Sequence, residues 1–398
     1  MTGVKLILEC FIVVNMKIAQ VTSYFQSRYY GSYEYFLCRQ LVKLGHEVVV
    51  FTSNKESWQK ETANRRIGVE TEEYEGFVIH RLHSGPMIGI MPVIPKLITS
   101  LLKTKVDIIH AHDYYASSSF YGAIASRAKR VPFVLTQHND DLPPSLIKAF
   151  LYLYDSLTLA RYTLLQSGKI IALSGNIKSH LKLMGTNESK IEIIPNGINT
   201  RLYAPNQMNL LEERWGITPP VVLFVGRLDE EKGIEYLLQA FSKVIADIPE
   251  AKLVVVGRGP KEMELKSLTR NLGLPNVFFL GAVENRLMPS IYVGCEVFVL
   301  PSLREPFGNV VIEAMAAGKP VIGSYVGGIK DAIIHGVTGF HVPPKSSARM
   351  SELLIKLLGD VSLRERMGRN ARERAVSVYD EELVIRKIEK VYNDLCAS

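Results

Sequence analysis

The chain has 398 residues, of which 47% are hydrophobic and 22% are charged, and its mean hydropathy is +0.09. This balance excludes a disordered chain, a coiled coil and a collagen-like fibre, and the length predicts two or three domains. The net charge is +7, and residues 1–200 hold 22 Lys and Arg against 16 Asp and Glu. Because the basic residues are dispersed and no nucleic-acid-binding motif is visible, we expect no nucleic-acid partner.

The four cysteines, Cys10, Cys38, Cys295 and Cys396, are scattered along the chain and form no CxxC pair. We therefore expect neither a disulfide framework nor a structural zinc site, and a cytoplasmic location is predicted. No apolar run reaches the ~18–20 residues that a membrane span needs.

The first fifteen residues, MTGVKLILECFIVVN, contain an apolar stretch that Glu9 interrupts, and no small-residue cleavage site follows it. They therefore do not match a signal peptide. Beginning at Met16, the sequence MKIAQVTSYF is typical of a first β-strand. We expect residues 1–15 to be an extension outside the fold.

Short β-branched apolar runs alternate with amphipathic segments along most of the chain. This alternation predicts parallel strands covered by helices on both faces. The predicted strands are residues 17–22, 47–52, 106–110, 133–137, 170–174 and 191–194, followed by 221–225, 253–256, 277–280, 297–300 and 321–323. The predicted helices include residues 33–44, 117–130, 233–245, 309–317 and 380–395.

There are too many predicted strands for one sheet, so we predict two Rossmann-like, doubly wound α/β domains. The segment PNGINTRLYAP at residues 195–205, which is rich in Pro, Asn and Gly, marks the break. We expect an acceptor domain over residues 16–200, a donor domain over 201–378, and a terminal helix over 379–398 that returns to the first domain. Because ligands bind beyond the carboxyl ends of parallel strands, the chemistry is expected in the loops that follow them.

The stretch LPSLREPFGNVVIEAMAAGKPVI carries the densest chemical signal. It predicts a loop that presents Glu305 and a helix that starts near Phe307 and Gly308, with Pro306 in its first turn. Gly308 permits a close approach of ligand to backbone, and the amides at a helix start attract anions. Glu305 and Glu313 are placed to bind hydroxyl groups on either side of a bound phosphate. A helix-capping acid and a solvated glutamate are the alternative.

With Pro-Phe-Gly after the first Glu and Glu-Ala-Met-Ala-x-Gly-x-Pro-Val around the second, this stretch closely resembles the signature of glycosyltransferase family 4. The segments VVLFVGRLDEEKGIEYLLQAF, KLVVVGRGP, NVFFLGAV, GGIKDAIIHGVTGFHVPP and IEIIPNGINTRLYAP also resemble the family, and the resemblance covers essentially residues 16–395. It implies the GT-B fold, in which two Rossmann-like domains face each other across a cleft. It also implies retaining transfer of a hexosyl group from a nucleotide-diphosphate sugar.

The resemblance assigns roles to donor-side residues. Arg227 and Lys232, which follow the predicted strand 221–225, clamp the diphosphate and stabilise the leaving nucleotide. The alternative is two solvated charges beside the acids at 229–231. Glu305 binds hydroxyls of the transferred sugar and Glu313 those of the ribose. The further donor-side residues are Phe307, Gly308, Asn309, Val310, Gly257 and Arg258, although a tight turn also explains the glycine at 257. Gly327 and Gly328 either line the donor pocket or form a plain turn.

The first domain carries a weaker set of candidates. Gly31-Ser32-Tyr33-Glu34 resembles the family's Gly-Gly-x-Glu loop, with Ser32 in place of the second glycine, and it assigns Gly31 to the donor diphosphate. Glu34 serves the acceptor or caps a helix.

Three histidines lie at or near the ends of predicted strands. His138 follows the strand 133–137, where the family places a histidine near the reacting centre. His110 and His112 share one face of their strand, and His112 and Asp113 are acceptor-side candidates. These side chains are of metal-ligand type, but the family usually works without a metal, so we expect no metal and no other cofactor.

The family has no agreed enzymic nucleophile and none is evident in this sequence, so the resemblance implies a short-lived oxocarbenium-like centre that the acceptor hydroxyl attacks from the face that the phosphate leaves. We expect a UDP- or GDP-sugar donor and a glycan, lipid-linked or small sugar acceptor. A nucleotide-sugar epimerase and a non-catalytic nucleotide-sugar-binding subunit are the alternatives. Segments 91–105 and 146–165 are apolar with interspersed Lys, Tyr and Phe. They are either core-facing helices or a face that docks on the inner side of a membrane.

Overall fold

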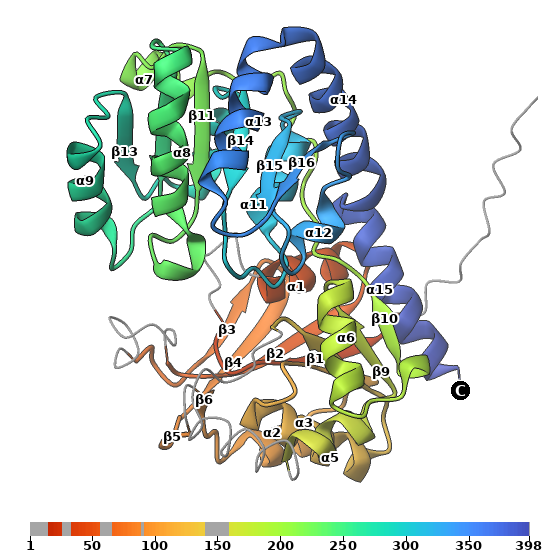
Figure 1. Cartoon of the computed structure of the whole chain (residues 1–398). Helices are drawn as coiled ribbons and strands as arrows, with labels where there is room; N and C mark the ends of the chain where they lie inside the picture. The colour runs from red at the N-terminus through yellow and green to blue at the C-terminus, as the bar shows by residue number, and fades with distance from the viewer. Residues whose placement is uncertain (1–14, 26–32, 56–65, 89–90, 140–158, 398) are drawn as a thin grey trace, which may run out of the picture. The chain divides into compact units, whose positions relative to one another are not determined.

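The computed structural model describes residues 15–25, 33–55, 66–88, 91–139 and 159–397 (Figure 1). The chain forms two compact units: one contains residues 1–135, 150–169 and 389–398, and the other contains 136–149 and 170–388. No helix in the described ranges is both long and apolar enough to cross a membrane.

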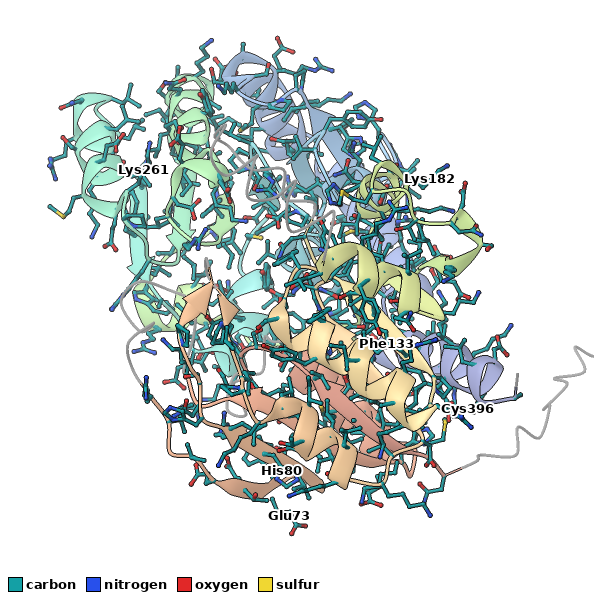
Figure 2. All side chains as sticks on the ribbon, turned by 90° about the horizontal axis from the view of Figure 1, so that it is seen from below. Glu73, His80, Phe133, Lys182, Lys261 and Cys396 are labelled. Carbon is teal, nitrogen blue, oxygen red and sulfur yellow. The ribbon has the colours of Figure 1, made fainter. Side chains whose placement is uncertain are left out.

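The first large sheet has eight strands in the order β10-β9-β8-β7-β1-β2-β4-β3. Its recorded strand pairs are parallel except β3–β4, which is antiparallel and closes one edge, where Figure 2 shows Glu73 and His80. The strands are β1 Lys17–Val21, β2 Glu47–Ser53, β3 Thr71–Tyr74, β4 Phe77–Leu82, β7 Ile108–His112, β8 Phe133–Gln137, β9 Lys169–Ala172 and β10 Ile191–Ile193, with the separate hairpin β5 Met87–Ile88 and β6 Met91–Pro92. The helices between them are α1 Tyr33–Lys43, α2 Leu97–Lys103, α3 Ser117–Lys129, α5 Leu159–Gln166, α6 Gly175–Leu183 and the short η1 Glu188–Lys190.

The second sheet has six parallel strands in the order β13-β12-β11-β14-β15-β16. This is the strand order of the dinucleotide-binding Rossmann sheet. The strands are β11 Val221–Val225, β12 Lys252–Val256, β13 Val277–Gly281, β14 Val297–Leu300, β15 Val321–Ser324 and β16 Gly339–Val342. The helices are α7 Leu210–Trp215, η2 Glu230–Lys232, α8 Ile234–Asp247, α9 Glu262–Asn271, η3 Asn285–Leu287, α10 Met288–Tyr292, α11 Asn309–Ala316, α12 Ile329–Ala332, α13 Ser347–Gly359, α14 Val361–Val378 and α15 Glu381–Cys396.

Burial explains why these runs form strands. Strands β11, β12 and β14 consist almost entirely of side chains with little or no exposure to water, as parallel strands covered on both faces require. Every predicted strand is present, most within a residue or two of the predicted ends. Strands β3, β4, β5, β6 and β16 were not predicted, and β7 runs two residues beyond the predicted 106–110.

Helix ends in the second unit also follow local chemistry. Helix α7 ends at Gly216 in the left-handed conformation (φ 64°), and α14 begins where the Asp360 side chain accepts a hydrogen bond from the amide of Leu363. The described cysteines Cys38, Cys295 and Cys396 are free thiols.

Candidate functional site

The strand order of the second sheet reverses between β11 and β14, because β12 and β13 lie beyond β11 whereas β15 and β16 lie beyond β14. In open parallel sheets, the loops after the two strands at such a reversal diverge, and ligands bind there. In this chain those loops are residues 226–233 and 301–308. The fold therefore gathers Arg227, Lys232 and Glu305 from two distant parts of the sequence.

Lys232 and Glu305 join the two loops. The Nζ atom of Lys232 lies 2.6 Å from Oε2 of Glu305, and the hydroxyl of Ser302 lies 3.5 Å from the same oxygen. The two charged side chains are only 19% and 11% exposed. Because separating a largely buried ion pair is costly, this pair fixes the cation and the carboxylate relative to each other.

Arg227 occupies a more open position. Its side chain is 42% exposed, and its Nε donates to a carboxylate oxygen of Asp229. A carboxylate two residues away orients the guanidinium through a charge-assisted hydrogen bond. The sequence analysis gave two charges beside the acids at 229–231 as an alternative. Arg227 does contact one of these acids, Asp229, whereas Lys232 contacts Glu305 instead.

The loops after β11 and β12 lie backbone to backbone. The amide of Gly226 donates to Val256 at 3.0 Å, and the amide of Leu228 donates to Arg258 at 2.9 Å. Gly257 has φ 134°, and a β-carbon there would overlap the carbonyl oxygen of Gly226. The close approach of the Gly226 carbonyl therefore requires glycine at position 257 even without a ligand. This is the tight-turn explanation that the sequence analysis gave as an alternative. The side chain of Arg258 is exposed.

Helix α11 begins at Asn309, directly after Gly308, which has φ 92°. The prediction that Pro306 lies in the first helical turn is wrong, because the left-handed backbone at Gly308 ends the loop and delays the helix. Phe307 is buried and packs edge-on against Tyr379, with ring centroids 6.3 Å apart. The first amides of a helix have no partner within it and carry the positive end of its dipole. The start of α11 is therefore suited to an anion.

Gly327 and Gly328 pack against the loop that carries Glu305. A β-carbon on Gly327 would overlap the carbonyl oxygen of Glu305, and one on Gly328 would lie 2.6 Å from Cα of Phe307. The amide of Gly328 also donates to the Glu305 carbonyl at 3.0 Å. The backbone of Gly327 and Gly328 thus packs directly against the backbone of the loop that carries Glu305. A role in lining a donor pocket stays a prediction.

Glu313 lies in the second turn of α11. Its Oε2 accepts a hydrogen bond of 2.6 Å from the hydroxyl of Tyr292, and the hydroxyl of Tyr203 lies beside the same carboxylate. Burial raises the pKa of the Glu313 carboxyl, and the two tyrosines oppose that rise. The carboxylate is therefore held by tyrosines rather than solvated.

A polar network lies inside the first unit. His110 and His112 are both buried on β7, and their rings stack with centroids 4.8 Å apart, which confirms that they share a face. Nε2 of His112 lies 3.0 Å from Oε1 of Gln20, whose amide nitrogen lies 3.4 Å from the hydroxyl of Tyr392. That hydroxyl lies 2.5 Å from Nδ1 of His110. Residues from β1, β7 and α15 therefore fix the orientation of His112.

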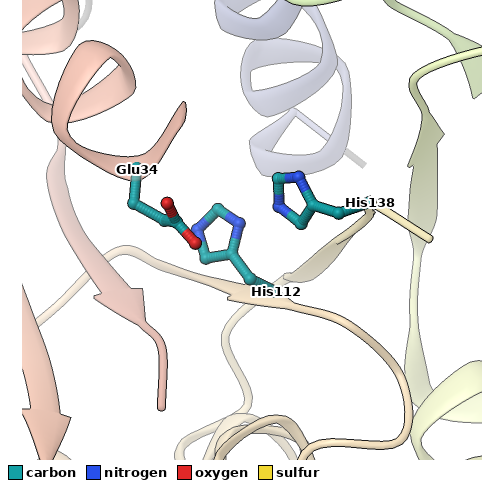
Figure 3. Close-up of side chains that lie close together, drawn as sticks. All are labelled: Glu34, His112 and His138. Atoms are coloured by element: carbon teal, nitrogen blue, oxygen red, sulfur yellow. The ribbon is translucent and has the colours of Figure 1, made fainter. Parts of the chain in front are cut away.

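Glu34, His112 and His138 lie close together at the carboxyl edge of the first sheet (Figure 3). Each offers one ligand atom, and these atoms lie within 4.8 Å of one another. Two imidazoles and a carboxylate are a donor set that Zn²⁺ accepts, and they are equally able to bind sugar hydroxyls. The expectation of no metal stays a prediction. Asp113 follows β7 with φ 63°, and Gly31 and Ser32 lie outside the described residues.

Several residues around α11 were missed by the sequence analysis. The side-chain amide of Asn196 donates to Oδ1 of Asn309 at 2.7 Å, and the hydroxyl of Ser174 donates to the carbonyl of Pro306 at 3.1 Å. Together with Tyr203 and Tyr292 they fix the helix start and its carboxylate. No local spacing predicts these contacts, because the partners are far apart in the sequence.

Comparison with known proteins adds family evidence. The model "Glycosyltransferase Family 4" matches residues 31–202, and "Glycosyl transferases group 1" matches residues 210–374. An uncharacterized glycosyltransferase of Methanocaldococcus jannaschii is 32% identical, over 95% of this chain and 98% of that protein. The N-acetyl-alpha-D-glucosaminyl L-malate synthase of Bacillus anthracis is 28% identical, over 74% of this chain and 76% of that protein.

Solved structures agree on the fold. Anabaena Alr3699/HepE in complex with UDP matches with a TM-score of 0.79 and 22% identity, covering 96% of this chain and 100% of that chain. Sucrose-phosphate synthase from Thermosynechococcus elongatus matches with a TM-score of 0.77 and 24% identity, again covering 96% and 100%. The predicted GT-B fold class is confirmed. The chain belongs to glycosyltransferase family 4, the group 1 glycosyl transferases, and is a glycosyltransferase that uses nucleotide sugars.

Proposed function

We propose that this protein is a retaining glycosyltransferase that moves a hexosyl group from a UDP- or GDP-sugar to a hydroxyl of a glycan, lipid-linked sugar or small sugar. The observation that carries this proposal is the Lys232–Glu305 pair at the strand-order reversal, beside the start of α11. A cation, helix amides and two carboxylates match a donor whose two phosphates lie between two hydroxyl-bearing rings. The complexes of Anabaena HepE with UDP and with UDP-glucose support testing uridine first.

In this proposal the protein positions the donor and stabilises charge. Arg227 and Lys232 bind the diphosphate, Glu305 binds sugar hydroxyls, and Glu313 binds the ribose. The bond between the anomeric carbon and the phosphate oxygen breaks, and the acceptor oxygen forms the new bond on the same face. The departing phosphate oxygen takes the acceptor proton. The remaining contacts we propose are Gly31, Gly257, Arg258, Phe307, Gly308, Asn309 and Val310 to the donor, His138 to the sugar, and Glu34, His112 and Asp113 to the acceptor.

A lipid-linked acceptor is our first choice because of the composition of three helices of the first unit. Helices α2, α3 and α5 contain no Asp or Glu, and their exposed side chains include Leu102, Leu165 and Arg161. Exposed cationic and apolar side chains on these helices favour an anionic membrane, so we propose that the enzyme docks on the cytoplasmic face of a membrane. Most of segment 146–165 lies outside the described residues. Co-sedimentation with anionic but not with zwitterionic vesicles is expected, and equal pelleting with both would contradict this part.

The first test is thermal unfolding with UDP, GDP, ADP and TDP. A ligand at about 100 times its Kd adds ~2.7 kcal/mol of stability, which raises the Tm of a unit of this size by roughly 5 °C or more. We expect a shift with UDP or GDP. Proton NMR of the transferred sugar then tests retention of the anomeric configuration. No shift with any nucleotide would favour a non-catalytic subunit, and an isomerised sugar nucleotide formed without acceptor would favour an epimerase.

A further inference from the structure

We propose that Tyr292 and Tyr203 are positioning residues that hold the Glu313 carboxylate for the ribose of the donor nucleotide. The proposal rests on the proposed function, in which Glu313 accepts hydrogen bonds from ribose hydroxyls. It adds that ribose recognition depends on two tyrosines that no motif marks. One precedes β14, and the other lies in the PNGINTRLYAP segment.

Both tyrosines converge on one carboxylate. The hydroxyl of Tyr292 donates to Oε2 of Glu313 at 2.6 Å, and the hydroxyl of Tyr203 lies beside the same group. Their rings lie 5.9 Å apart at 55° to each other. Two hydroxyl groups that face one carboxylate from differently tilted rings restrict its orientation more than one hydroxyl can.

Tyr292 is itself rigidly held. It is fully buried at the end of α10, and its ring lies 5.6 Å from that of Phe298 on β14. The thiol of Cys295 donates to the Tyr292 carbonyl at 3.3 Å, and Nζ of Lys319 donates to the carbonyl of Val293 at 2.8 Å. Because the core fixes Tyr292, the flexible partner is Glu313, whose side chain has to adopt the rotamer that meets the hydroxyl.

The hydrogen-bond capacity fits a diol. A carboxylate accepts about four hydrogen bonds; the Tyr292 hydroxyl supplies one of them, and the Tyr203 hydroxyl lies beside the group. A ribose presents two vicinal hydroxyls, which could donate to the remaining acceptor positions of the carboxylate. Burial disfavours the ionised carboxylate and raises its pKa, and the tyrosines oppose that rise.

The proposal is tested with pairs of nucleotides that differ only in their ribose hydroxyls. The Kd values of UDP and 2′,3′-dideoxy-UDP are measured by calorimetry for the wild type, Tyr292→Phe and Tyr203→Phe. The control is Tyr35→Phe in the other unit, which removes a similar tyrosine–glutamate hydrogen bond of 2.7 Å to Glu75. If UDP does not bind, the guanosine and adenosine pairs replace it, since the proposal concerns the ribose and not the base.

We expect the wild type and Tyr35→Phe to prefer the ribonucleotide about tenfold or more, as for hydrogen bonds to a charged group. In Tyr292→Phe this preference falls to about threefold or less, while affinity for the dideoxy nucleotide stays within about twofold. Tyr203, which is only half-buried, provides a second variant should Tyr292→Phe not fold.

Two results would overturn the proposal and leave the donor assignment intact. One is a wild type that binds UDP and its dideoxy analogue equally. The other is a folded Tyr→Phe variant that keeps the full preference or weakens both ligands equally, as a merely structural role predicts. Failure of the wild type to bind any nucleotide would refute both the proposed function and this inference.

Discussion

Replacing Lys232 by alanine tests the central element of the candidate site. The change removes a cation whose Nζ lies 2.6 Å from Oε2 of Glu305 and leaves a carboxylate whose side chain is only 11% exposed. Two consequences are expected. The second unit loses stability because a buried charge loses its partner, and turnover falls because the diphosphate loses one of its two proposed cations.

The magnitude follows from the geometry. At 2.6 Å and an effective dielectric constant of about 20, the attraction is about 6 kcal/mol, most of which desolvation offsets. Removing one partner of a fully buried pair costs about 3–5 kcal/mol. Because Lys232 keeps 19% exposure, we expect about 2–3 kcal/mol, which lowers the Tm by roughly 4–12 °C. Loss of one charge-stabilising group lowers turnover by about a hundredfold or more.

The assay combines thermal unfolding with steady-state turnover, and two further variants make it decisive. In Lys232→Ala/Glu305→Gln no charge is left unpaired, so at least half of the lost Tm should return while turnover stays low. The control Lys266→Ala breaks a pair of 2.7 Å with Glu262 on the surface of α9, and it should cost less than about 1 kcal/mol. Near-normal turnover of Lys232→Ala, or a double variant no more stable than the single one, would refute this reasoning.

Four other outcomes are expected. Arg227→Ala lowers turnover about a hundredfold with little change in Tm, because its side chain is 42% exposed; normal turnover would remove it from the clamp. Gly327→Ala lowers the Tm more than Gly185→Ala, since only the former β-carbon meets backbone, and equal Tm values would contradict the close approach. Burial raises the pKa of Glu313, so UDP affinity measured from about pH 8 to about pH 5 should weaken at a higher pH than an ordinary carboxyl predicts. Glu313→Gln should abolish this loss of UDP affinity at low pH. If the affinity of the variant and that of the wild type depend on pH in the same way, the prediction is wrong. Turnover should persist after dialysis against EDTA; loss that Zn²⁺ restores would instead assign a metal to Glu34, His112 and His138.

The fold was largely predictable because buried parallel strands have a simple pattern. A strand covered on both faces needs consecutive β-branched and apolar residues, and VVLFV of β11 has this pattern. The edge strand β3, with the sequence TEEY, has no such pattern, because it is half-exposed and owes its conformation to pairing with β4. The end of β7 was misplaced because His110 and His112 interrupt the apolar run, although both are buried.

The candidate site was predictable only in part. The motif identified Glu305 and Glu313, but their partners, Lys232 and Tyr292, are 73 and 21 residues away in the sequence. Such pairs depend on which strands become neighbours, and periodicity does not encode this. The domain boundaries and the residue roles stay predictions.

The glycines and the charged residues of the motif differ in what they indicate about a ligand. Gly257 and Gly327 are explained by close packing of backbone on the neighbouring loop, so their presence requires no ligand. Charged side chains are different, because a carboxylate removed from water is unfavourable unless something compensates it. At Glu305 the compensation comes from Lys232, and at Glu313 it comes from two tyrosines. A core of the same volume would be stable without these groups, so their placement at the strand-order reversal is the stronger indication of a ligand.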